Sequence, residues 1–194
     1  MTREDGASPS APEASGKAEH SLLVVIDMQR FFTAGEPWAT PGFEDLIDPI
    51  GALADGFGER VVFTRFLVPE QPQGSWQAYY RMWPQVTGPA AAPLAELVPP
   101  WTGRPTLDAP TFSKWGPPLA DRLGDHALVL CGVSSDCCVL ATAVAAADAG
   151  ASVRVVADAC AGLDAAAHER ALALLAGFAP QIEISSVAAE LAAR

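Results

Sequence analysis

The chain has 194 residues, which is enough for one domain of common size and too few for two comfortable ones. Half of the residues are hydrophobic and 18% are charged, a globular composition that argues against a disordered or fibrous protein. Twelve Lys and Arg residues stand against 23 Asp and Glu residues, which gives a formal net charge of −11. Because this balance provides no basic field for phosphates or anionic lipids, nucleic acid and membranes are not expected as partners.

The apolar segments of the chain are short. No run reaches the roughly 18 to 20 residues that a membrane span needs, and residues 1–20 lack the apolar stretch of a signal peptide. We therefore expect a cytoplasmic protein. In a reducing compartment its four cysteines are expected to be thiols rather than disulfides: Cys131, Cys137, Cys138 and Cys160.

Two regions with different composition divide the chain. Residues 1–19 are rich in Ala, Ser, Pro, Gly and Glu without apolar periodicity, which predicts a flexible tail before a domain over residues 20–194. In the domain, runs rich in Val, Ile and Leu indicate strands that are buried on both faces, as in a parallel sheet covered by helices. The clearest strands are predicted at 22–26, 61–66, 128–131 and 153–157, with weaker ones at 106–108 and 181–185.

Helical stretches lie between these strands. Residues 138–149 and 164–176 are predicted helices, and Gly150 and Gly177 follow them in the position where a left-handed glycine often ends a helix. The alternation of strands and helices predicts an α/β fold, a three-layer α/β/α sandwich with a six-stranded, mostly parallel, doubly wound sheet.

Residues 67–105 interrupt the alternation with eight prolines and a group of aromatic residues. Trp76, Tyr79, Tyr80 and Trp83 fall at spacings of three and four, which places them on one face of a helix. An insertion of this length in a small domain is usually functional. We interpret it as a lid over a substrate or as a subunit interface, and the sequence does not separate the two.

Three reactive side chains follow predicted strands, at the sheet edge where open α/β folds bind their ligands. Asp27 follows the first strand, Lys114 lies in the loop after the weak third strand, and Cys138 opens a predicted helix. A thiol at a helix N-terminus near an ammonium has a lowered pKa, which suits a nucleophile. The alternatives are a turn residue for Asp27, a solvated loop lysine for Lys114, and a small buried side chain for Cys138 or its neighbour Cys137.

The segments around these residues resemble the isochorismatase-like cysteine hydrolases, a family that includes N-carbamoylsarcosine amidase and nicotinamidase-related amidohydrolases. The matching text is VVIDMQRFF around Asp27, FSKWG around Lys114, and CGVSSDCCVLATAVAAADAGASVRVVADA from Cys131 to Ala159. The resemblance extends from Ser21 to about Ser186.

The resemblance implies a catalytic triad of Asp27, Lys114 and Cys138, and its register selects Cys138 over Cys137. It also implies a cis peptide between Val133 and Ser134. Backbone N–H groups of Ser134 and Cys138 would form the oxyanion hole.

The implied activity is hydrolysis of a C–N bond in a small amide or ureido (carbamoyl) substrate through a thioester, without a cofactor. The chain departs from the family's TDxC string, since it has Ser135-Asp136-Cys137-Cys138, in which a hydroxyl is kept. The Asp-x-His metal string of the nicotinamidase branch is replaced by Thr64-Arg65-Phe66-Leu67-Val68-Pro69, so no metal site is expected. The alternatives are an isochorismatase-type vinyl ether hydrolase and a non-catalytic metabolite-binding protein of the same fold.

Further residues are candidates for contact with a small-molecule substrate: Gln29, Phe32, Trp38, Trp76 and Tyr80. Gln29 matches a position that is often Gln in the family, but it suits a solvated helix start equally well. Since family members usually associate and the aromatic segment offers apolar area, we expect a homo-oligomer, either a dimer or a tetramer.

Overall fold

A computed structural model describes residues 21–194, and the tail predicted over residues 1–19 lies outside the described residues. The strands are β1 (Ser21–Ile26), β2 (Val61–Phe66), β3 (Thr106–Ala109), β4 (Ala127–Val133), β5 (Val153–Ala161) and β6 (Ile182–Ser185). They form a six-stranded sheet in the order β3-β2-β1-β4-β5-β6. Every pairing is parallel, so the predicted fold class is confirmed and the sheet is parallel throughout.

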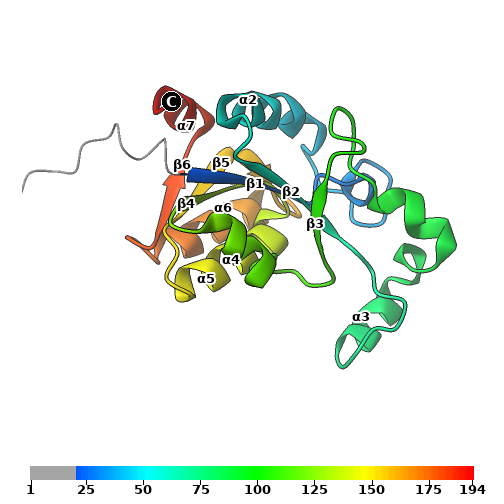
Figure 1. The fold of residues 1–194 in the computed structure, drawn as a ribbon. Coiled ribbons are helices and arrows are strands. Elements are labelled where there is room, and N and C mark those ends of the chain that lie inside the picture. The colour runs from blue at the N-terminus through cyan, green and yellow to red at the C-terminus, as the bar shows by residue number, and fades with distance from the viewer. Residues whose placement is uncertain (1–20) are drawn as a thin grey trace, which may run out of the picture.

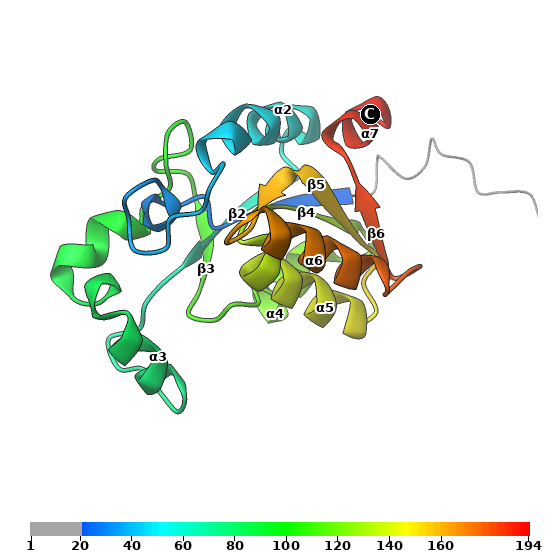
Figure 2. The ribbon, with the colours of Figure 1, turned by 180° about the vertical axis from the view of Figure 1, so that it is seen from behind.

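Helices cover both faces of the sheet, as expected for strands without a solvated side. Figures 1 and 2 place α2 and α7 on one face and α4, α5 and α6 on the other. The α-helices are α2 (Ile47–Phe57), α3 (Trp76–Met82), α4 (Pro117–Leu123), α5 (Leu140–Asp148), α6 (Ala165–Ala176) and α7 (Val187–Ala192). Short 3-10 helices lie at η1 (Arg30–Phe32), η2 (Glu44–Leu46), η3 (Pro84–Val86) and η4 (Pro89–Ala95). Within residues 21–194, no helix is long and apolar enough to cross a bilayer.

The core lies between the sheet and these helices. All six residues of β1 are buried, and β4 is buried from its second residue onward, which explains their near-continuous apolar sequences. The insertion at residues 67–105 contains α3, η3 and η4 and projects beyond the edge of the sheet that β3 forms (Figure 1). Strand order reverses between β1 and β4, which creates the crevice at which open α/β sheets bind ligands.

Two helix ends differ from the sequence predictions. The helix predicted from Cys138 is preceded by a π-helical turn, η5 (Ser135–Val139), and α5 begins only at Leu140. Such turns occur often at functional sites. Gly150 has a left-handed φ of 94°, as expected, whereas Gly177 has a φ of −68° because the chain continues into a further turn in which Phe178 N–H bonds the carbonyl of Leu175.

Gly132 lets the two central strands approach each other directly before the crevice. Its φ is 107°, and it pairs with Ile26 at the carboxyl end of β1. A Cβ at this position would overlap the backbone carbonyl oxygen of Ile26. The close approach of β1 to β4 therefore requires a glycine here.

Replacement of Gly132 by Ala tests this constraint against Gly150→Ala, where φ is also positive but no atom lies within 4 Å of the new Cβ. Gly150→Ala should lower the free energy of unfolding by about 1 kcal/mol through backbone strain alone. Gly132→Ala should add an overpacking cost of about 1–3 kcal/mol. Urea denaturation measures both, and equal losses would contradict the close approach.

Candidate active site

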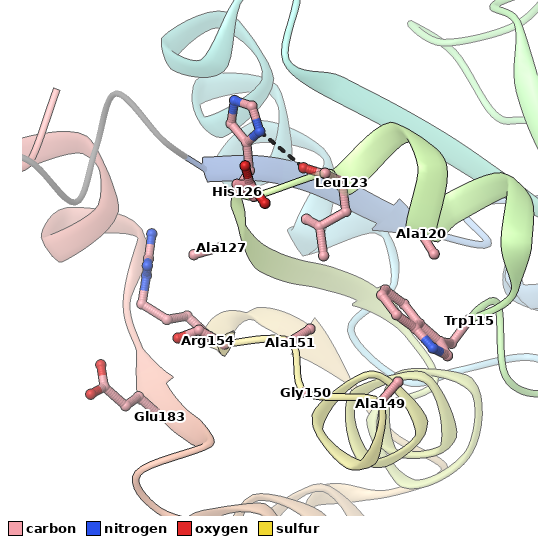
Figure 3. A pocket seen from close by; sticks show the side chains of 13 residues that line it. Trp115, Ala120, Leu123, His126, Ala127, Ala149, Gly150, Ala151, Arg154 and Glu183 are labelled. Atoms are coloured by element: carbon pink, nitrogen blue, oxygen red, sulfur yellow. Dashed lines mark hydrogen bonds between the residues drawn. The ribbon is translucent and has the colours of Figure 1, made fainter.

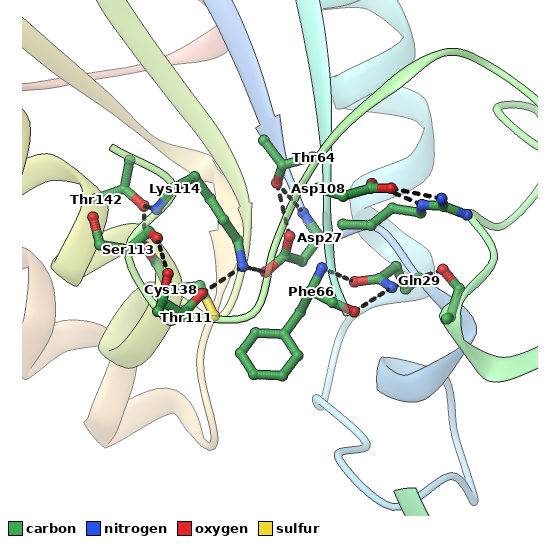
Figure 4. Close-up of polar contacts among 12 residues, drawn as sticks. Asp27, Gln29, Thr64, Phe66, Asp108, Thr111, Ser113, Lys114, Cys138 and Thr142 are labelled. Atoms are coloured by element: carbon green, nitrogen blue, oxygen red, sulfur yellow. Dashed lines mark hydrogen bonds and ion pairs between the residues drawn. The ribbon is translucent and has the colours of Figure 1, made fainter. Parts of the chain in front are cut away.

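Asp27 is the first residue after β1 and lies at the strand-order reversal. Its φ of 50° makes it the one non-glycine residue with a positive φ among residues 21–194, a conformation that often marks functional positions. The side chain is fully buried. Thr64 Oγ1 in β2 donates to Asp27 Oδ1 at 2.7 Å and accepts the Asp27 backbone N–H at 3.2 Å. These bonds hold one carboxylate oxygen and leave the other directed toward Lys114 (Figure 4).

Lys114 forms a buried ion pair with Asp27. Its Nζ lies 2.9 Å from Asp27 Oδ2 and donates to the carbonyl oxygen of Thr111 at 2.9 Å. Both charged side chains have no exposed surface, and the ammonium lies 4.7 Å from the ring centroid of Phe66. Asp27 Oδ2 accepts no well-directed hydrogen bond among the described residues, so this oxygen keeps a lone pair for a proton.

Thr142 in α5 joins the lysine to the nucleophile candidate. Its hydroxyl accepts the backbone N–H of Lys114 at 2.9 Å and donates to the backbone carbonyl of Cys138 at 2.7 Å. One side chain thereby fixes the distance between the loop after β3 and the turn after β4. Figure 4 shows Asp27, Lys114 and Cys138 gathered from three separate segments of the chain.

Cys138 lies in the π-helical turn after β4, and its thiol is almost fully buried. A hydrogen bond with the Cys137 thiol, burial and the Asp27 carboxylate raise the pKa of the Cys138 thiol well above its usual value, while Lys114 lowers it only in part. The lowered pKa predicted from a helix N-terminus is therefore wrong, because Cys138 lies inside the turn and beside a carboxylate. A thiol whose pKa is raised needs a base before it can act as a nucleophile.

A cavity of about 320 Å³ opens onto this thiol. The turn after β4 contributes Ser134, Asp136, Cys137 and Cys138 to its lining, and the peptide bond between Val133 and Ser134 is cis. Phe32 and Trp38, both candidates from the sequence, line its wall. The insertion contributes Tyr79 and Trp83, so one face of α3 and its C-cap residue form part of the cavity wall.

The other three substrate-contact candidates lie outside this wall. Gln29 uses its side-chain amide to bind backbone, since Nε2 donates to the carbonyls of Phe66 and Ala95 and Oε1 accepts the N–H of Phe66. It therefore ties the ends of β1 and β2 to η4 and is neither solvated nor directed at a substrate. Trp76 packs against Phe112 with ring centroids 4.7 Å apart, and Tyr80 faces a different cavity.

A larger cavity of about 610 Å³ lies at the opposite edge of the sheet, where β4 and β5 begin (Figure 3). Its described lining contains neither a cysteine nor a lysine. Arg154 is engaged by Glu190 at 2.7 and 3.0 Å, and His126 Nδ1 lies 2.9 Å from the carbonyl oxygen of Leu123. The described lining of this cavity therefore has no counterpart of Cys138 and Lys114, which lie at the carboxyl ends of the strands.

The chain is similar to known proteins in sequence and in structure. A family model described as the isochorismatase domain matches residues 21–186. The chain belongs to the isochorismatase family. Comparison with curated proteins finds no match.

Solved structures share the fold of this isochorismatase-family chain. A cysteine hydrolase from Pseudomonas syringae pv. phaseolicola 1448A is 18% identical, with a TM-score of 0.77 and coverage of 100% of this chain and 98% of the other. An isochorismatase family protein from Desulfovibrio vulgaris is 25% identical, with a TM-score of 0.72 and coverage of 90% and 99%. A pyrazinamidase of Pyrococcus horikoshii in complex with zinc is 25% identical, with a TM-score of 0.70 and coverage of 86% and 99%.

The residues of this isochorismatase-family chain do not fit a divalent metal at the end of β2. Arg65 stands there, and its guanidinium binds Asp108 at 3.0 and 2.8 Å and Glu96 at 3.1 Å, which occupies the nearby carboxylates. Leu67, Val68 and Pro69 follow without a donor side chain. Within residues 21–194, no group of three or more His, Cys, Asp or Glu side chains is placed to hold a metal ion.

Replacement of Lys114 by Met tests the ion pair. Because Asp27 would remain buried without a partner, the variant should lose about 3–5 kcal/mol of stability, and Asp27→Asn in the same chain should restore part of it. Loss of the ammonium should also raise the pKa of the Cys138 thiol further, since Lys114 lowers it. Lys114→Arg should rescue poorly, because a planar guanidinium does not fit the place of a point charge.

Urea denaturation and the rate of iodoacetamide alkylation at Cys138 from about pH 5 to about pH 10 measure these effects. Arg122→Met, which removes an exposed cation from α4, is the matched control and should leave both unchanged. A Lys114→Met variant with the stability and alkylation profile of the unmodified protein would show that Lys114 is only a loop lysine.

Proposed function

We propose that the protein is a cysteine hydrolase that cleaves the C–N bond of a small amide or ureido substrate through a thioester. The observation that carries the proposal is the buried Asp27–Lys114 ion pair beside a thiol that opens onto a cavity. A site that only held a metabolite would have no physical need for a desolvated carboxylate and ammonium next to a cysteine.

The first half of the reaction forms the thioester. Asp27 Oδ2 takes the proton of the Cys138 thiol, and the thiolate attacks the carbonyl carbon of the substrate. Lys114 pairs with the Asp27 carboxylate before the transfer and stabilises the thiolate after it. The carbonyl electron pair moves onto oxygen, where the backbone N–H groups of Ser134 and Cys138 donate to the oxyanion.

The second half regenerates the thiol. The tetrahedral intermediate collapses, the C–N bond breaks, and Asp27 returns its proton to the departing ammonia or amine. Water then attacks the thioester carbonyl while Asp27 accepts a proton from it. Breakage of the C–S bond releases the acid, and the proton held by Asp27 returns to the Cys138 sulfur.

Replacement of each adjacent cysteine tests the nucleophile. Cys138→Ala should abolish ammonia release from amides, because the proposed mechanism has no other nucleophile. Cys137→Ala, the matched control, should retain most of it. Mass spectrometry of quenched reactions should find an acyl adduct on the peptide that holds Cys138. An active Cys138→Ala variant beside an inactive Cys137→Ala variant would place the nucleophile at Cys137.

Chelation tests the metal-free mechanism. Treatment with EDTA should leave kcat and KM unchanged, because the side chains after β2 offer no ligand set and the thiol is activated by a carboxylate. The measurement is ammonia release before and after dialysis against the chelator. Loss of activity that zinc or iron restores would contradict the mechanism.

A further inference from the structure

The wall of the active-site cavity is aromatic. Six of its lining residues carry aromatic rings: Phe32, Trp38, Phe66, Tyr79, Trp83 and Phe112. Trp38 lies at the centre, with ring centroids 6.4 Å from those of both Tyr79 and Trp83 and interplanar angles of 44° and 72°. Adjacent rings inclined in this way form neighbouring walls of a box, and ring faces carry negative electrostatic potential.

Asp136 is the one charged side chain among the described residues that line this cavity. Its Oδ1 accepts the backbone N–H of Leu163 at 3.1 Å, and no cation within residues 21–194 forms an ion pair with it. The ammonium of Lys114 is already paired with Asp27 at 2.9 Å. The cavity therefore combines ring faces with an uncompensated carboxylate, and both attract positive charge.

We propose that the active site selects small amides that carry an ammonium group and rejects amides that carry a carboxylate. The ammonium lies against the faces of Trp38, Tyr79 and Trp83 and is paired by Asp136, while the amide carbonyl reaches Cys138. This inference rests on the proposed hydrolase function and specifies its substrate. A substrate carboxylate would lie against a cavity wall that offers no cation, and it would lie near the negative charge of Asp136.

The size of the cavity fits such a substrate. A volume of about 320 Å³ is at the lower end of the range of about 300–1,000 Å³ for ligand pockets. It suits a compact amide better than a long chain. Quaternary ammonium groups are the cations that aromatic boxes hold best, since they are weakly hydrated.

Three small amides isolate the charge. Trimethylglycinamide carries a quaternary ammonium, 3,3-dimethylbutanamide has the same shape with carbon in place of nitrogen, and malonamate carries a carboxylate. Because the ammonium also activates the nearby carbonyl chemically, each kcat/KM from ammonia release is divided by the rate constant for hydroxide-catalysed hydrolysis of the same amide. This normalised kcat/KM for the cation should exceed that for its neutral isostere by about tenfold or more. Malonamate should be at least about a hundredfold slower than the cation. A neutral isostere as fast as the cation, or comparable hydrolysis of malonamate, would overturn the proposal.

Asp136→Asn tests the residue, because the amide oxygen of Asn can still accept the Leu163 N–H. The ratio of the normalised kcat/KM for the cation to that for the neutral isostere should fall toward one. Glu169→Gln removes one negative charge from an exposed position in α6 and should leave the ratio unchanged. An unchanged ratio in Asp136→Asn would remove Asp136 from the proposal.

Measurements of binding affinity distinguish a failure of this inference from a failure of the proposed hydrolase function. If no amide is hydrolysed, the hydrolase proposal fails, and tryptophan fluorescence of the Cys138→Ala variant still measures affinity for trimethylglycinamide and its isostere. Tighter binding of the cation then supports charge selection on its own. Hydrolysis of all three amides at similar rates would leave the hydrolase proposal intact and overturn the charge selection.

Discussion

The buried ion pair between Asp27 and Lys114 is the constraint on which the rest of the site depends. Removing two charges from water is expensive, and their attraction offsets this only when the remaining polar atoms are also bound. Thr64 supplies a hydrogen bond to the carboxylate, and the carbonyl of Thr111 accepts one from the ammonium. These contacts form only if the ends of β1, β2 and β3 lie in one register. The arrangement of the site therefore depends on the register of the sheet.

The two members of this pair act on the pKa of the Cys138 thiol in opposite directions, since Asp27 raises it and Lys114 lowers it. A lone ammonium would lower the pKa of this thiol, but the hydrogen bond with Cys137, burial and the carboxylate together raise it. A protonated resting thiol is less exposed to oxidation and alkylation than a thiolate. In the proposed mechanism the proton moves to Asp27 only when a carbonyl is in place, which couples activation to substrate binding.

The insertion at residues 67–105 completes the cavity from outside the sandwich. Its helix α3 contributes Tyr79 to the wall, while Tyr80 on the next position faces a separate cavity. Trp76 joins the ring cluster around Phe112 and holds the helix against the loop that carries Lys114. One segment therefore lines the cavity and packs against the loop that carries Lys114. The interpretations of this segment as a lid and as a subunit interface both stay predictions.

The sequence by itself determined the fold class, the places of the six strands, and the three reactive residues after strands, because buried parallel strands and motif spacing are local signals. Only the tertiary structure decided which side chains form hydrogen bonds with these reactive residues. Thr64 and Thr142 are ordinary threonines in the sequence, and they become part of the site because sheet register and helix packing bring them to Asp27 and Cys138. The direction of the shift in the thiol's pKa depends first on the neighbouring Cys137, and then on burial and on a carboxylate that lies 111 positions earlier in the chain. Only the last two causes required the tertiary structure.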